Sequence, residues 1–214
     1  MPDNNIDLFS LRPLEKADLT FISSWFQDVS DLAVFDRSSR IPYDLIACER
    51  LWALSGKTDD SGEKCWFAIT SDATEVIGIV GLEGISSVNR DAVVALYVDQ
   101  PNRRKGIGIR AATLMLDFAF RQLGLNRVTS YYRADNVSSR DLTRQAGFEI
   151  EGTMRQAWFA DGTFHDMIVV GLLADDWASR RDTLADELGS ETIVAFGDPV
   201  TSASTWPPKI TKFR

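Results

Sequence analysis

The sequence predicts a mixed α/β domain, in which a mostly antiparallel sheet carries helices on its faces. Short β-rich runs follow one another in the first half of the chain, then alternate with helical patterns and end in a hairpin. Residues 92–98 are apolar on both faces apart from one tyrosine hydroxyl, which is typical of a central strand. With 214 residues, of which 44% are hydrophobic and 25% charged, the chain can build a full core.

The N-terminal half is expected to contain two helices and four strands. The helices are predicted from apolar residues that recur at helical spacing, and the strands from short apolar or β-rich runs. In chain order these elements are a strand at 6–11, helices at 19–26 and 43–54, and strands at 65–70, 76–82 and 92–98.

The C-terminal half is expected to alternate helices and strands. A helix at 109–123 is apolar except for one polar stripe, on which Asp117 and Arg121 form a favourable i,i+4 pair. A strand at 127–132 and a helix at 136–146 follow, and Gly147 closes that helix. Asp161-Gly162 predicts a hairpin between strands at 151–159 and 163–173.

The chain changes character after Trp177, so we expect a domain at 1–177 and an extension at 178–214. The extension contains a short helix at 178–188 and a tail with two adjacent prolines. Two states of the tail are open: it packs through Ile193, Phe196 and Trp206, or it is loose.

Composition narrows the classes of partner. A net charge of -8 and a pI near 4.7 argue against nucleic acid or an anionic membrane, and are compatible with a cationic substrate such as an amine. Cys48 and Cys65 lack metal-type spacing and the chain has one histidine, so no metal is expected. Without a signal peptide or a membrane-length apolar run, we expect a cytoplasmic protein. A homodimer is compatible with the sequence.

The strongest functional signal is a basic turn before the long helix, which we call the basic glycine turn (residues 103–110). Cations at a helix N-terminus oppose the helix dipole, so this arrangement is unfavourable unless an anion binds there. Free backbone N–H groups would face the same anion. The turn consists of Arg103, Arg104, Lys105, Gly106, Ile107, Gly108, Ile109 and Arg110.

A dinucleotide site is one candidate, because Gly106, Gly108 and Ala111 fit the pattern GxGxxG/A. However, residues 99–105 separate the glycines from the preceding strand, and residues 126–131 contain no carboxylate to bind a ribose. A P-loop also fails, because no Gly-Lys-Ser/Thr sequence follows these glycines. A pyrophosphate site of another kind therefore remains.

The spacing of Arg103, Gly106 and Gly108 resembles the coenzyme A motif of the GCN5-related N-acetyltransferase (GNAT) superfamily. The resemblance extends over roughly residues 6–177, in the right order, and is strongest to the branch that acetylates ribosomal-protein N-termini and spermidine. It also rests on Leu11-Arg12-Pro13-Leu14, Asn136-x-x-Ser139, Ala146-Gly147-Phe148, Glu151-Gly152, His165-Asp166 and Trp177.

The resemblance implies a sheet of about seven strands, splayed at the cofactor site, with about four helices on its faces. It implies acetyl transfer from acetyl-CoA to a primary amine. The amine belongs to a protein N-terminus or to a small molecule such as a polyamine or an amino sugar. The residues implied in acetyl-CoA binding are Leu96, Tyr97 and Val98 on the strand, 103–110 in the turn, and Asn136 and Ser139, which are also natural helix caps.

The usual catalytic groups are missing from their expected places. Val93 stands where the branch often has a glutamate, and Thr143 stands where related proteins have a tyrosine acid. The substitutes are Glu83, His165 and Tyr97, each of which also has an ordinary structural explanation, and Asp91 reads as a solvated loop carboxylate. The alternative function is a non-catalytic module that binds coenzyme A as a sensor or assembly subunit.

Overall fold

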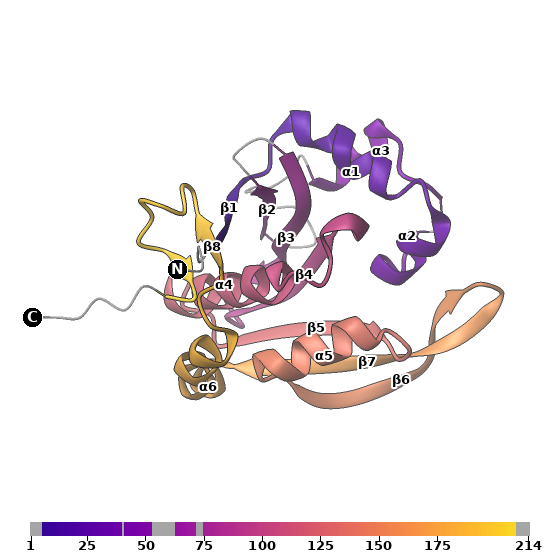
Figure 1. Cartoon of the computed structure of the whole chain (residues 1–214). Coiled ribbons are helices and arrows are strands. Elements are labelled where there is room, and N and C mark those ends of the chain that lie inside the picture. The colour runs from indigo at the N-terminus through magenta and orange to yellow at the C-terminus, as the bar shows by residue number, and fades with distance from the viewer. Residues whose placement is uncertain (1–5, 40, 53–62, 72–74, 209–214) are drawn as a thin grey trace, which may run out of the picture.

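Strands and helices follow one another along the chain in nearly the predicted order (Figure 1). The computed structural model describes residues 6–39, 41–52, 63–71 and 75–208. The strands are β1 (Asp7–Pro13), β2 (Glu63–Ser71), β3 (Glu75–Ser86), β4 (Asp91–Val98), β5 (Arg127–Arg133), β6 (Glu149–Ala160), β7 (Thr163–Leu173), β8 (Thr192–Phe196) and β9 (Thr205–Trp206). The α-helices are α1 (Leu19–Trp25), α2 (Val29–Phe35), α3 (Leu45–Trp52), α4 (Ile107–Arg121), α5 (Val137–Ala146) and α6 (Ala174–Leu188), and two short 3-10 turns occupy Lys16–Asp18 and Gln100–Asn102.

One mixed sheet runs through the described chain in the order β6-β7-β5-β4-β3-β2-β1-β8-β9. Its neighbours are antiparallel except for the pairs β4–β5 and β1–β8, which confirms the predicted fold class. The expected count of about seven strands was too low, because the described residues form nine.

The extra elements come from segments too short or too irregular to show a clear period. The segment of α2 is only seven residues long, and it starts where the Asp28 side chain accepts a hydrogen bond from the Ser30 N–H. The structure thus has six α-helices in its described part, where about four were expected. Residues 53–54 of the helix expected at 43–54 lie outside the described residues.

The sheet divides into two leaves between β4 and β5. These parallel strands pair only at Asp91–Arg127, Ala92–Val128 and Val93–Thr129, and then they part. Beyond this point β4 remains paired with β3, and β5 remains paired with β7. Figure 1 shows the leaf of β1–β4 with α1–α3, the leaf of β5–β7 with α5, and α4 between them. The predicted splay is therefore present.

Two apolar cores hold the first leaf between helices. Leu114 and Met115 of α4 join the larger core, where they pack with residues of β1, β3, β4 and β5. Ile22 of α1 and Tyr97 of β4 belong to the second core, on the other face. Alternating residues of β4 therefore face different cores, as the pleat of a central strand requires. No helix in the described chain is long and apolar enough to cross a membrane.

The C-terminal segment is packed against this core. The boundary expected after Trp177 falls inside α6, and β8 then adds to the sheet by pairing with β1 in parallel. Ile193 and Phe196 lie on β8, and Trp206 on β9 is fully buried. Of the two open states of the tail, the described part is the packed one, whereas residues 209–214 lie outside the described chain.

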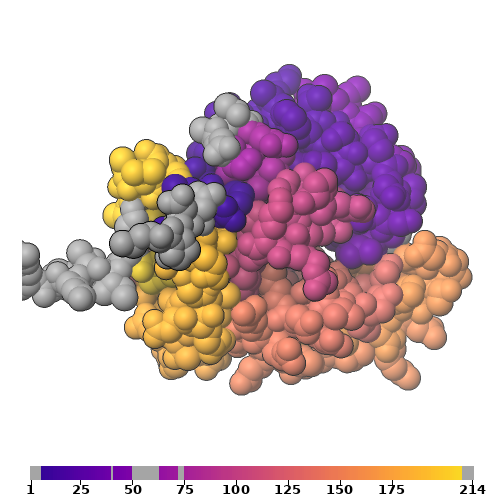
Figure 2. Space-filling view, viewed as in Figure 1, coloured from indigo at the N-terminus to yellow at the C-terminus, as the bar shows by residue number. Residues whose placement is uncertain are grey.

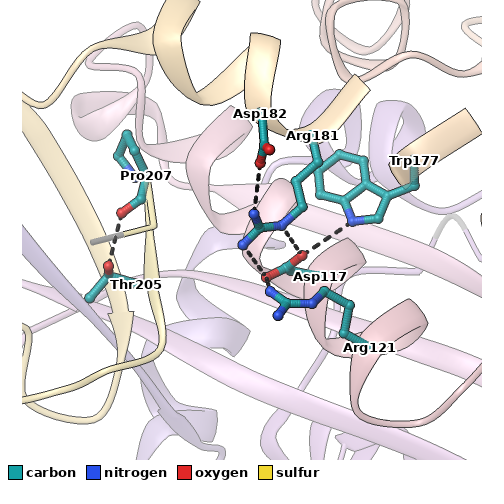
Figure 3. Close-up of polar contacts among 7 residues, drawn as sticks. All are labelled: Asp117, Arg121, Trp177, Arg181, Asp182, Thr205 and Pro207. Carbon is teal, nitrogen blue, oxygen red and sulfur yellow. Dashed lines mark hydrogen bonds and ion pairs between the residues drawn. The ribbon is translucent and has the colours of Figure 1, made fainter. Parts of the chain in front are cut away.

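Asp117 on α4 is the polar anchor of this segment (Figure 3). Its carboxylate accepts hydrogen bonds from Arg181 at 2.7 and 3.1 Å and from the Trp177 indole at 3.3 Å. The predicted pair with Arg121 is also present, at 3.1 Å. The Arg181 guanidinium lies over the Trp206 ring, 5.5 Å from its centroid. The ion pair thus ties α6 and β9 to α4.

We predict that Asp117→Asn lowers the free energy of unfolding by about 2–3 kcal/mol, because Arg181 loses a charged acceptor at a site that is largely shielded from water. The matched control is Arg121→Gln, which removes an exposed partner of the same carboxylate and should cost about 0.5 kcal/mol or less. Urea denaturation followed by circular dichroism measures both. Equal losses in the two variants would contradict the anchoring role.

Candidate functional site

A cleft of about 960 Å³ opens where the two leaves of the sheet part. Figure 2 shows the hollow between the first leaf and the β5–β7 leaf. The walls come from β4, β5, the start of α4, α5 and the segment that follows α2. The cleft therefore collects residues that are far apart in the sequence. Of the site residues predicted from sequence, it brings together Glu83, Leu96, Tyr97, Val98, Arg103, Arg104, Gly106, Gly108, Ile109, Asn136 and Ser139.

The edge of β4 supplies backbone groups to this cleft. The Ser130 hydroxyl on β5 donates to the Val94 carbonyl at 3.3 Å, and Arg103 Nε donates to the Val98 carbonyl at 2.8 Å. Because N–H and C=O groups alternate in direction along a strand, the groups of Leu96 point the same way. Leu96 lies after the last β4–β5 pair and lines the cleft. Its backbone can bind an extended, amide-bearing ligand as a further strand would.

The basic glycine turn supplies a second set of backbone donors. Gly106 is the N-cap of α4 and has a φ of 74°, which favours glycine over residues with a side chain. The first N–H groups of a helix have no partner within the helix, and those of α4 start at Ile107, next to Gly106 and Gly108 in the cleft wall. This N-terminus can hold a phosphate or pyrophosphate.

The cations of the turn have different surroundings. Arg104 is exposed at the cleft, and its side chain makes no hydrogen bond or ion pair with the described part of the chain. Arg103 instead folds over the Tyr97 ring, 5.2 Å from its centroid, and lies 3.7 Å from the Asp31 carboxylate. Lys105 donates to the Asn102 side chain at 2.8 Å. Arg104 is therefore the cation most available to an anionic ligand.

Arg110 faces away from the cleft. It is 3% exposed, and its guanidinium donates to the carbonyls of Gly106 at 3.3 Å and Gly189 at 3.4 Å, and to the carbonyl of Leu188. Burial lowers the pKa of this guanidinium, against the opposing effect of Glu191 at 3.2 Å. The sequence pattern placed Arg110 with the phosphate ligands, whereas the structure turns its side chain to the C-terminal segment.

The start of α5 carries the predicted contacts to the pantetheine arm. Asn136 lines the cleft, and its side-chain oxygen accepts a hydrogen bond from the Ser139 N–H at 3.1 Å, so it is a helix cap as expected. Thr143, on the same helix, also lines the cleft. Its hydroxyl donates within the helix, to Ser139 at 2.9 Å or Arg140 at 3.1 Å. It is therefore already engaged and poorly suited to act as a proton donor.

Glu83 is the carboxylate nearest to the place where the resemblance expects a base. It lies on β3 directly opposite Val93, so both side chains are on the same face of the sheet. Thr129 pairs with Val93 and Tyr131 follows it by two residues, so this face also carries Tyr131. Burial and the charge of Glu83 raise the pKa of the Tyr131 phenol. A carboxylate thus stands on β3, beside the position on β4 where the resemblance expects one.

Tyr97 is packed in an aromatic cluster at the cleft wall. It stacks on Trp25 at 5.4 Å between ring centroids, and its hydroxyl lies 3.4 Å from the Asp31 carboxylate. Burial, together with the charge of Asp31, raises the pKa of Tyr97 to about 12. At neutral pH the phenol stays protonated, so it can donate a hydrogen bond but is a poor base.

The other two carboxylate and imidazole candidates lie elsewhere. His165 is on β7, paired with Trp158, and its Nδ1 is 3.8 Å from the Asp135 carboxylate. Asp91 starts β4, opposite Arg127. Neither belongs to the described cleft lining, although Trp158 beside His165 does. Among the described residues, no group of three or more His, Cys, Asp or Glu side chains is arranged to hold a metal ion.

The sequence reasoning missed the bridge that α2 forms across the cleft. Asp31 on α2 accepts from Gln100 at 2.8 Å beside the basic glycine turn, and the Ala33 carbonyl accepts from the Trp158 indole at 2.8 Å on the other leaf. Arg37, just after α2, lies over the Tyr131 ring at 5.9 Å. The only sequence signals were the Asp28 cap and one acidic residue, Asp31, in a seven-residue segment.

Comparison with known proteins agrees with this geometry. The acetyltransferase (GNAT) domain family matches residues 9–149. The chain is 25% identical over 173 residues to the spermidine N(1)-acetyltransferase of Escherichia coli, covering 81% of this chain and 90% of that enzyme. It is 29% identical over 107 residues to the ribosomal protein uS5-alanine N-acetyltransferase of the same organism, covering 48% and 55%.

A solved structure shares the fold. The spermidine N-acetyltransferase of Vibrio cholerae, crystallised with CoA and spermine, superimposes with a TM-score of 0.70 at 23% identity. The match covers 79% of this chain and 98% of that protein. About a fifth of this chain thus has no counterpart there.

We predict that Gly106→Ala destabilises the protein more than Gly162→Ala does. The two glycines have φ values of 74° and 73°, so each variant carries the same backbone penalty of about 1–2 kcal/mol. At Gly106 the new Cβ would also lie 2.4 Å from the buried Arg110 Nη1, whereas nothing lies within 4 Å at Gly162. Displacing that guanidinium should add about 1–3 kcal/mol. Equal unfolding midpoints of the two variants in thermal denaturation would contradict this prediction, because they would mean that the Arg110 side chain moves aside at no cost.

Proposed function

The chain belongs to the acetyltransferase (GNAT) domain family, and from this premise we propose that it transfers an acetyl group from acetyl-CoA to a primary amine, with Glu83 as the general base. The observation that carries the proposal is the position of Glu83 in the cleft between the open edge of β4 and the other leaf. The backbone edge that would bind acetyl-CoA and the carboxylate that would deprotonate the amine thus lie in one cavity.

The cofactor half of the site fits coenzyme A in shape and chemistry. The N-terminus of α4 and the exposed Arg104 offer donors and charge to the pyrophosphate. The Leu96 backbone offers an N–H and a C=O to the amide groups of the pantetheine arm, and Ser139 lies on the facing wall. When bound, acetyl-CoA supplies the thioester whose C–S bond breaks as the amide C–N bond forms.

The acceptor half lies on the face of the sheet that α2 covers. Glu83 and Asp36 line this part of the cleft with Arg37 and the aromatic rings of Tyr131 and Trp158. Carboxylates beside aromatic faces suit a cationic amine, since the charge attracts the ammonium and the rings pack against its alkyl chain. The relatives are named for the acetylation of spermidine and of an alanine of ribosomal protein uS5, and both amines suit this description.

A base is needed because an alkyl ammonium must lose a proton before it attacks. With a pKa of about 10.4, deprotonation costs roughly 4–5 kcal/mol at neutral pH. We assign this proton to Glu83, which accepts it directly or through a water molecule. Burial and the charge of Glu83 keep the Tyr131 phenol protonated, so it can donate a hydrogen bond on the same face.

A second function, a non-catalytic coenzyme A module, is favoured by one observation. Val93 carries no proton-transfer group, and the Thr143 hydroxyl is committed to the helix backbone. The two functions differ in turnover rather than in binding, since both use the same cofactor half.

We expect free thiol to be released from acetyl-CoA in the presence of an amine panel that contains spermidine, a peptide with an N-terminal alanine and an amino sugar. The catalysed rate should exceed the rate without enzyme by several orders of magnitude for at least one amine. Calorimetry with coenzyme A serves as the control for binding. Tight binding without turnover of any amine would support the non-catalytic module, and no binding would reject both.

We predict that Glu83→Gln lowers kcat by about 10²–10⁴, because removing a general base typically costs that much. The matched control is Asp91→Asn, an acid-to-amide change on the adjacent strand and outside the described cleft lining, which should leave kcat unchanged. An unchanged kcat in Glu83→Gln would remove Glu83 from the mechanism.

A further inference from the structure

The rear of the basic glycine turn is held by a segment that we call the C-terminal strap (residues 188–192). The strap joins α6 to β8, and it lies outside the residues 9–149 matched by the acetyltransferase family. It contacts the turn through Arg110 and through the Thr192 hydroxyl, which donates to the Lys105 carbonyl at 3.5 Å. Both Arg110 and Thr192 are buried.

Arg110 joins the two segments through one guanidinium. It reaches the carbonyls of Leu188 and Gly189 and the carboxylate of Glu191 on the strap, and the carbonyl of Gly106 on the turn. The Gly106 carbonyl also accepts the Arg110 backbone N–H at 3.5 Å, as an N-cap carbonyl does. A buried cation with this many carbonyl acceptors has little freedom to move.

The held carbonyls set the direction of the N–H groups that follow them. In a trans peptide, the carbonyl of one residue and the N–H of the next point in opposite directions. Thr192 fixes the Lys105 carbonyl and Arg110 fixes the Gly106 carbonyl, both on the strap side. The N–H groups of Gly106 and Ile107 therefore point away from the strap, at the position where Gly106 lines the cleft.

We propose that Arg110 is a positioning residue for coenzyme A, through which the C-terminal strap orients the N–H groups of the basic glycine turn toward the cofactor. Arg110 itself is not among the residues that line the cleft. The inference rests on the proposed function, because it assumes that the turn binds the pyrophosphate. It gives the C-terminal segment a role in cofactor affinity as well as in stability.

A purely structural role for Arg110 makes a different prediction. In that case its removal lowers stability, but the folded fraction binds coenzyme A as tightly as the wild type. A variant that loosens the C-terminal segment elsewhere provides the comparison. Arg181→Met does so, because Arg181 anchors α6 to Asp117 at 2.7 Å and has no contact with the turn among the described residues.

The test measures the Kd of coenzyme A by calorimetry, and kcat at saturating acetyl-CoA, for wild type, Arg110→Met and Arg181→Met. We expect Arg110→Met to raise the Kd roughly tenfold and to change kcat less than about twofold, since the loss falls on binding rather than on chemistry. Arg181→Met should lower the melting temperature and keep the wild-type Kd.

An unchanged Kd in folded Arg110→Met, or an equal rise in Arg181→Met, would overturn the proposal. If Arg110→Met does not fold, Thr192→Val decides the question, because it preserves shape and removes only the hydroxyl that faces Lys105. We expect it to raise the Kd roughly threefold, as loss of one neutral hydrogen bond would, and an unchanged Kd overturns the proposal. Failure of the wild type to bind coenzyme A would instead reject the proposed function.

Discussion

The end of pairing between β4 and β5 is the constraint on which the rest of the structure depends. A fully paired sheet would bury the edge of β4 and leave no cleft. Because pairing ends after Val93–Thr129, the Leu96 backbone is left facing the other leaf. The same parting exposes the N-terminus of α4, the helix that connects β4 to β5. The unpaired backbone groups and the cleft thus both result from the end of pairing between β4 and β5.

An open sheet needs supports on each side of the gap. On one face α2 spans it, with Asp31 contacting the side of the basic glycine turn and Ala33 accepting from Trp158 on the other leaf. On the opposite face α4 packs against the core, and Asp117 and Arg110 connect it to the C-terminal segment. The same contacts that stabilise the fold therefore fix the geometry of the cleft.

Much of this could be predicted from sequence, because it depends on local patterns. The central strand, the buried long helix and the glycine turn between them each have a period or a spacing, and together they indicate the anion site. The parted strands were expected only from the resemblance to the family. The direction of Arg110 could not be predicted, since a cation near a helix N-terminus can face a ligand or the chain behind it. That choice depends on the carbonyls of Leu188 and Gly189, about 80 residues away. The pairing of Glu83 with Val93 required the register of β3 against β4, which composition does not encode.

The most direct test of the parted-strand site is backbone amide exchange measured by nuclear magnetic resonance with and without coenzyme A. If the cleft holds the cofactor through the edge of β4 and the N-terminus of α4, binding should slow exchange at Leu96 and at residues 106–109. Amides of β6, on the outer edge of the sheet, should be unaffected. Unchanged exchange at Leu96 and in the turn, with protection elsewhere, would contradict a site built on the parting of β4 and β5.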